Sequence, residues 1–146
     1  MKIDRLDHLV LTVRDLNKTI AFYTNVFGMQ PVSFGADRRA LAFGQQKINL
    51  HSVDAPRKPH ALHPTPGSAD LCFITEAPMA EIVAHLQNVG VAIEEGPVSR
   101  TGALGAITSV YFRDPDANLI EVSNYARDAQ QNAPADEPLA TLAARS

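Results

Sequence analysis

The feature of this sequence that most constrains its fold is an internal repeat. Asp70 lies 62 positions after His8, and at this offset the segments that follow the two residues align without a gap through a strand and a helix. The matched pairs are Leu9 with Leu71, Leu11 with Phe73, Ile20 with Ile82, Phe27 with Val89, and Gly28 with Gly90. A repeat this regular predicts two similar units that pack their sheets against one another.

The first repeat predicts a strand, a helix and three more strands. A strand over 5–13 is followed by a helix with Asp15 as its N-cap and Gly28 as its left-handed end. One face of this helix is expected to carry Leu16, Ile20, Tyr23 and Phe27. Short strands follow over 29–34, 39–43 and 47–53.

The second repeat predicts the same βαβββ order. A strand over 69–75 precedes a helix with Pro78 near its first turn and Gly90 at its end. The apolar face of that helix is expected to hold Met79, Ile82, Leu86 and Val89. Strands are predicted over 91–96, 106–113 and 118–124. The fold class is therefore α+β, with two tandem βαβββ modules.

These elements define one predicted domain over 1–125. Module one covers 4–54 and module two covers 69–125, joined by a proline-rich linker over 55–68 that holds His60 and His63. Both histidines are expected to be ordinary linker residues. The Ala-, Pro- and charge-rich tail over 126–146 is expected to be mobile or weakly helical.

Polar side chains occupy matching positions in the two repeats. His8 and Asp70 each begin a strand and stand on the face opposite the leucines. In the last strand of module two, Glu121 takes the corresponding face, and in module one Asn49 and His51 share it. Inward acids and imidazoles in symmetric positions are typical of a metal site.

Composition excludes several other classes of function. The chain has 146 residues, a formal net charge of −3 and basic residues that are scattered rather than clustered, which argues against nucleic acid or an anionic membrane as partner. No apolar run approaches the roughly 20 residues of a membrane span, and no secretory signal is visible. A single cysteine, Cys72, suits a reducing cytoplasm.

The chain resembles the vicinal oxygen chelate superfamily, which includes glyoxalase I, extradiol dioxygenases, fosfomycin-resistance enzymes and bleomycin-binding proteins. The resemblance covers 4–125 and is carried by "DHLVLTVRDLNKTIAFYTNVFGM" and "YFRDPDANLIEVSNY". With "GPVSRTGALGAITS", these segments look closest to small glyoxalase-domain proteins of the virulence-associated type.

The resemblance implies one divalent metal ion held by the first and last strands of each module. His8 and Glu121 match the commonest ligands, whereas Asp70 stands where many relatives carry histidine. The fourth position falls on Asn49 or on His51, depending on how the strands are aligned, and the sequence leaves both open. The ligand set suits Zn, Ni, Co, Mn or Fe.

Four further residues are expected to contact substrate: Asn49, Cys72, Tyr111 and Arg113. Structural roles are the alternative for each of the last three, and for Cys72 that role would be a small buried strand residue.

The expected function is a metal-dependent lyase or isomerase of the glyoxalase type. The metal would bind the vicinal oxygens of a small substrate and stabilise an enediolate, with Glu121 and His51 as the catalytic groups. The alternatives are an iron-dependent extradiol-type dioxygenase, built on His8, His51 and Glu121, and a non-enzymatic drug-binding protein. A cytoplasmic homodimer is expected, and the modules pair either within one chain or across two. Glutathione dependence is left open.

Overall fold

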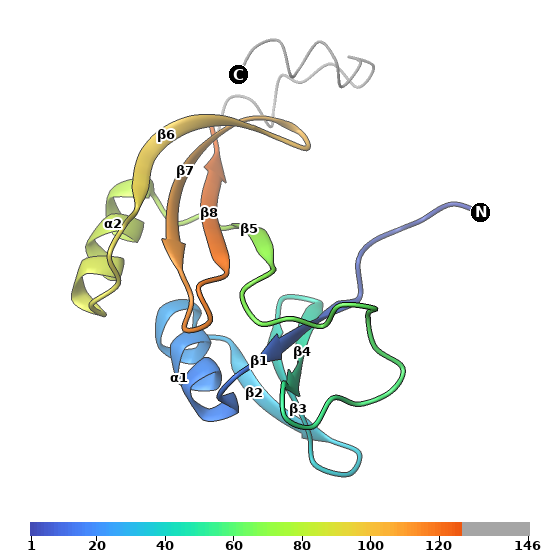
Figure 1. The fold of residues 1–146 in the computed structure, drawn as a ribbon. Coiled ribbons are helices and arrows are strands. Elements are labelled where there is room, and N and C mark those ends of the chain that lie inside the picture. Colours follow the sequence, from blue (N-terminus) through green and yellow to red (C-terminus); the bar gives the residue numbers. More distant parts are fainter. Residues whose placement is uncertain (127–146) are drawn as a thin grey trace. The chain divides into compact units, whose positions relative to one another are not determined.

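The computed structural model describes residues 1–126 of the chain, so the predicted tail over 126–146 lies almost wholly outside the described residues. Two βαβββ modules follow one another in the chain (Figure 1). Module one consists of β1 (His8–Val13), α1 (Leu16–Phe27), β2 (Gln30–Phe34), β3 (Arg38–Phe43) and β4 (Gln46–Ser52). Module two consists of β5 (Asp70–Ile74), α2 (Met79–Asn88), β6 (Glu95–Gly102), β7 (Gly105–Arg113) and β8 (Leu119–Tyr125). The α+β fold with two tandem modules is confirmed.

Each module contains one four-stranded mixed sheet with the same strand order. In module one the order is β1-β4-β3-β2, and in module two it is β5-β8-β7-β6. The first strand of each module lies at one edge of its sheet and pairs in parallel with the last strand, and the remaining pairs are antiparallel. The alternation predicted for the first strand is confirmed, since Leu11 and Val13 are buried while His8 and Val10 are exposed.

The prediction of a strand over 91–96 in module two is wrong at both of its ends. The structure begins β6 at Glu95 and continues it to Gly102, whereas the sequence predicted a strand over 91–96. The run "GPVSRTG" lacks alternating apolar residues because β6 lies at the edge of its sheet, where one side has no neighbour. Pro97 is tolerated at this edge, and the pairing register shifts between Glu95 and Val98.

Helix α1 begins and ends as predicted, but its buried face is rotated. The Asp15 carboxylate accepts a hydrogen bond from Lys18 N at 3.0 Å, and Gly28 ends the helix with a φ of 66°. The buried residues are Thr19, Tyr23 and Val26, rather than the predicted face of Leu16, Ile20, Tyr23 and Phe27. Tyr23 is common to both faces. The Tyr23 hydroxyl donates a hydrogen bond to the buried carboxylate of Asp114, which explains why the helix turns Tyr23 toward the interior.

That carboxylate belongs to the turn between β7 and β8, residues 114–118, which packs with module one. The chain divides into two compact units, and the first contains residues 1–69 together with this turn. Tyr23 Oη donates to Asp114 Oδ2 at 2.7 Å, and Arg14 N donates to Asp116 Oδ1 at 3.1 Å. Among the described residues, the second unit contains 70–113 and 119–126. In residues 1–126, no helix is long and apolar enough to cross a membrane.

Candidate functional site

His8 is held by its sequence neighbour in a way that suits a metal ligand. The His8 Nδ1–H donates to Asp7 Oδ2 at 2.8 Å, and this hydrogen bond is the main cause that lowers the pKa of the Asp7 carboxyl. Because a carboxylate only accepts, Nδ1 carries the proton, and the bare nitrogen of a neutral ring is Nε2. Histidines that bind metals usually donate their other ring N–H to a carboxylate or carbonyl in this manner.

The pairing of β4 with β1 bears on the choice between Asn49 and His51. In module one, Val10 pairs with Asn49, and in module two the equivalent Cys72 pairs with Glu121. Asn49 is therefore the register equivalent of Glu121. His51 lies two residues further along β4, pairs with Thr12, and corresponds to Ser123 in module two. The ligand role itself stays a prediction for both residues.

Both candidates at this position are buried without hydrogen-bond partners. Asn49 is 4% exposed and His51 is 7% exposed. Asn49 Oδ1 and both ring nitrogens of His51 have no partner. A buried polar group left without a hydrogen bond costs roughly 1–3 kcal/mol, so these atoms call for a bound ligand, an ion or water. Burial lowers the pKa of His51, assisted by the positive charges of Arg38 and Arg57, so this imidazole is neutral at pH 7.

Glu121 in module two is oriented by a chain of hydroxyl and thiol groups. Ser123 Oγ donates to Glu121 Oε1 at 3.3 Å. Ser109 Oγ lies 2.6 Å and Cys72 Sγ lies 3.4 Å from the same Ser123 oxygen. A hydroxyl has a single proton, so Ser109 and Cys72 are the donors to Ser123 in this arrangement. The carboxylate at the predicted ligand position is thus oriented by a hydrogen bond from Ser123, which itself accepts hydrogen bonds from Ser109 and Cys72.

Cys72 is exposed, so the alternative that it is a small buried strand residue is wrong. Its side chain follows the exposed alternation of Asp70 and Ile74 along β5. Partial desolvation raises the pKa of the Cys72 thiol, and the negative charge of the Glu121 carboxylate raises it further. Cys72 is therefore a thiol at neutral pH rather than a nucleophilic thiolate.

Tyr111 and Arg113 share one face of β7 but make different contacts. Tyr111 pairs with Glu121 across β7 and β8, and its hydroxyl accepts a hydrogen bond from Arg100 Nε at 3.1 Å. Burial raises the pKa of Tyr111, and the Glu121 carboxylate adds to this, whereas the Arg100 hydrogen bond lowers it. The Arg113 guanidinium binds Glu94, with a shortest contact of 3.1 Å. Their predicted contact with substrate stays a prediction.

The four predicted metal ligands are divided between the two units. His8 and His51 lie in the first unit, and Asp70 and Glu121 lie in the second. Within residues 1–126, no three side chains of His, Cys, Asp or Glu form a group that could hold a metal ion. Neither unit supplies a complete metal site alone. The individual donors nevertheless fit a metal, because His8 and Glu121 are both oriented by hydrogen bonds and Asn49 Oδ1 is buried without a donor.

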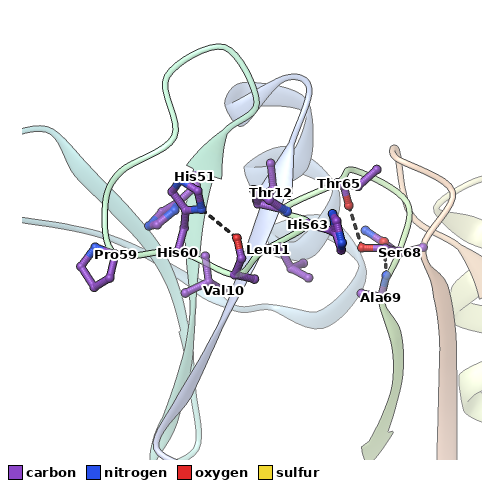
Figure 2. A pocket seen from close by; sticks show the side chains of 13 residues that line it. Val10, Leu11, Thr12, His51, Pro59, His60, His63, Thr65, Ser68 and Ala69 are labelled. Atoms are coloured by element: carbon purple, nitrogen blue, oxygen red, sulfur yellow. Dashed lines mark hydrogen bonds between the residues drawn. The ribbon is translucent and has the colours of Figure 1, made fainter.

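Sequence reasoning missed a pocket that the linker forms against module one. Its volume is about 150 Å³, and it is lined by His51, by Val10–Thr12 of β1, and by linker residues that include His60 and His63. Figure 2 shows His51 and His60 at one end and Thr65, Ser68 and Ala69 at the other. The path of an irregular linker has no periodic sequence signal, so nothing in the pattern places these histidines beside His51.

Comparison with known proteins identifies the family. The sequence profile of the Glyoxalase/Bleomycin resistance protein/Dioxygenase superfamily matches residues 5–122. This chain belongs to that superfamily.

Two relatives are similar along most of the chain. Virulence protein STM3117 of Salmonella typhimurium is 57% identical over 125 residues, which cover 86% of this chain and 87% of that protein. Its crystal structure matches with a TM-score of 0.85, covering 86% of this chain and 100% of that one. Glyoxalase domain-containing protein RDO1 of Mycosarcoma maydis is 54% identical, over 86% of this chain and 70% of that protein.

Structures of two further proteins share the fold at lower identity. Lactoylglutathione lyase from Agrobacterium tumefaciens is 22% identical, with a TM-score of 0.65 and coverage of 84% of this chain and 95% of that one. The fosfomycin resistance protein FosX from Listeria monocytogenes, in complex with Mn(II) and sulfate, is 22% identical, with a TM-score of 0.62 and coverage of 88% and 96%. These likenesses concern the fold alone.

Proposed function

We propose that this protein is a metal-dependent enzyme that uses His8, Asp70 and Glu121 to hold one divalent ion. Its reaction is a lyase or isomerase step of the glyoxalase type, on a small substrate with vicinal oxygens. Asn49 takes the fourth position, since its register matches that of Glu121, with His51 as the alternative. The donor set of imidazole and carboxylate suits Zn, Ni, Co, Mn or Fe. When bound, such an ion polarises substrate oxygens as a Lewis acid.

The residues of this chain then have separate tasks. Asp7 fixes the tautomer of His8, and Ser123 fixes one oxygen of Glu121. The Glu121 carboxylate is the group proposed to carry a proton to or from the substrate. Cys72 and Tyr111, whose pairing positions flank Glu121 on either side in the sheet, are proposed to contact the substrate as neutral hydrogen-bonding groups.

The single observation that carries this proposal is the hydrogen bond between Asp7 and His8. An exposed histidine at the start of a strand needs no carboxylate partner for packing, whereas a ligand histidine gains orientation and basicity from one. The test is the Asp7→Ala variant, for which we expect a loss of metal affinity of about 10-fold or more. Asp4→Ala is the control, because Asp4 is exposed in the same N-terminal segment. Unchanged affinity of Asp7→Ala for Mn(II) and Zn(II) would remove the basis of the proposal.

The second candidate function is an extradiol-type dioxygenase. The observation in its favour is that both nitrogens of His51 lack a protein partner, which leaves this ring available to a metal as the second histidine beside His8. The two reactions differ in one co-substrate, because a dioxygenase consumes O₂ and a lyase or isomerase does not. Oxygen uptake by the iron-loaded protein with a catechol probe therefore favours the dioxygenase, and turnover of a substrate without oxygen uptake favours the first proposal.

A homodimer is part of the same proposal. The pairing of modules is tested by mixing His8→Ala and Glu121→Ala proteins after unfolding and refolding them together. If modules pair across two chains, mixed dimers regain one intact set of ligands, and about a quarter of the sites recover metal. If they pair within one chain, no sites recover.

A further inference from the structure

We propose that the pocket between β1, β4 and the linker binds a small organic acid through its carboxylate or phosphate group, with His51 as the principal hydrogen-bonding residue. This inference rests on the proposed function in that it names the chemistry of the substrate. The pocket itself lies entirely within the first unit, so its binding can be measured without a metal.

His51 supplies the first argument. The ring is buried, lines the pocket, and has no hydrogen bond at either nitrogen. A neutral imidazole always has one N–H donor and one bare nitrogen. A fold seldom leaves both buried and unsatisfied unless something else occupies the adjoining space. Figure 2 shows the ring at the end of the pocket, beside His60.

The walls of the pocket are fixed before any ligand arrives. In the linker, two residues before the lining residue Pro59, Arg57 Nη2 donates to the Ala36 carbonyl oxygen at 2.6 Å, which attaches the linker to the turn between β2 and β3. At the other end of the linker, Ala69 N donates to Asn118 Oδ1 at 2.9 Å, and Ser68 Oγ donates to the Thr65 carbonyl oxygen at 2.7 Å. Preformed walls reduce the ordering cost of binding, which is characteristic of small-molecule sites.

His60 adds a second oriented imidazole. Its Nδ1 lies 2.8 Å from the carbonyl oxygen of Ala61, and because a carbonyl only accepts, Nδ1 carries the proton. His60 and His63 both line the pocket with His51, yet within residues 1–126 no three such side chains form a metal group. These histidines therefore point to recognition of a ligand rather than to chelation of a second ion.

The charge around the pocket selects an anion. The lining contains no aspartate and no glutamate. Arg38 and Arg57 do not line the pocket, but their positive charges help to lower the pKa of His51, which does. An oxygen group with a negative charge is attracted by both guanidinium groups and accepts the His51 N–H, and such charge-assisted hydrogen bonds are among the stronger ones. The volume of about 150 Å³ limits the bound group to a few heavy atoms, comparable to a small ring.

The test uses protein labelled with ¹⁵N in its histidines. Sodium phosphate and sodium acetate are added separately at constant ionic strength, so that screening is unchanged. We expect a saturable shift of the His51 ring resonances with at least one anion, and the anion preferred identifies the group as phosphate or carboxylate. Ethylene glycol is the neutral control and is expected to cause no saturable shift. Absence of saturation with both anions, or equal binding of ethylene glycol, would overturn the proposal.

Variants separate this pocket from the metal site. His51→Ala is expected to weaken anion binding by tenfold or more and to keep its metal content. His85→Ala, at an exposed position of helix α2, is expected to match the wild type. Arg38→Gln, which leaves His51 and the Arg57 hydrogen bond to Ala36 intact, is expected to weaken anion binding by about two- to threefold through loss of charge. If His51→Ala loses metal as well as anion, His51 is a ligand and the proposal is wrong. If the wild type binds the anion but no metal, the proposed function fails and the pocket assignment stands.

Discussion

Removing the Tyr23 hydroxyl tests how module one depends on the turn between β7 and β8. In Tyr23→Phe the ring keeps its contacts with Phe22 and Phe27, and only the donor to Asp114 is lost. Tyr23 is 0% exposed and Asp114 is 5% exposed, so water does not replace the lost donor. A hydrogen bond to a charged group contributes about 1.5–3 kcal/mol, and we expect the free energy of unfolding to fall by that amount.

The remaining hydrogen bonds of Asp114 limit the expected loss in the free energy of unfolding. Its carboxylate still accepts from Asn118 Nδ2 at 2.8 Å and from the backbone N–H groups of Asp116 and Asn118. The turn is therefore weakened and not abolished, and the m-value of denaturant unfolding is expected to stay unchanged.

The assay is urea unfolding followed by circular dichroism, with Tyr125→Phe as the matched control. The Tyr125 hydroxyl accepts one hydrogen bond, from Leu104 N at 3.1 Å, in an exposed position, so its loss is expected to cost less than about 1 kcal/mol. A loss below about 0.5 kcal/mol for Tyr23→Phe would refute the reasoning, since it would equal the usual effect of a surface substitution.

Three further outcomes follow from the same contacts. Burial, and then the Asp114 charge, raise the pKa of Tyr23 above its ordinary 10.0. Above pH 10 the unfolded chain loses a proton that the folded chain keeps, so the free energy of unfolding of the wild type should fall by up to about 1.4 kcal/mol more per pH unit than that of Tyr23→Phe in alkaline urea titrations. Equal slopes for the two proteins would contradict this. Gly67→Ala should destabilise the protein more than Gly44→Ala. Both glycines have positive φ, but only at Gly67 would a Cβ lie 2.7 Å from a backbone oxygen, that of Asp116. Equal thermal midpoints would contradict this, because they would mean that the turn shifts to accommodate the Cβ. A fragment of residues 1–62 should show no cooperative thermal transition, since it lacks the 114–118 turn, and a monomeric fragment with a sharp transition would disprove the dependence.

The sequence predicts the elements of this fold well because the repeat and the apolar periodicity are local signals. The order of elements in both modules and the caps at Asp15 and Gly28 follow from such signals. The edge strand β6 was misplaced because it lacks a buried face and therefore lacks alternation. The burial of Tyr23 against Asp114 joins residues 91 positions apart, and no local pattern encodes that contact.

The candidate site was predictable in part for the same reason. His8 and Glu121 stand out because each is a polar residue at a regular position in a strand. The choice between Asn49 and His51 depends on which residue of β1 each one pairs with, and strand register is a property of the folded sheet. The sequence predicts His60 and His63 as ordinary linker residues, because only the folded linker brings them to the pocket that His51 lines.

The metal content of three proteins tests the central claim most directly. Wild type, His8→Ala and Glu121→Ala are loaded with Mn(II), desalted and analysed for metal per chain, with His85→Ala and Glu76→Ala as matched controls. We expect one ion per chain in the wild type and both controls. We expect a loss of about tenfold or more in the two ligand variants, which stay folded because neither side chain belongs to the buried apolar core. Wild-type metal content in either His8→Ala or Glu121→Ala would contradict this claim.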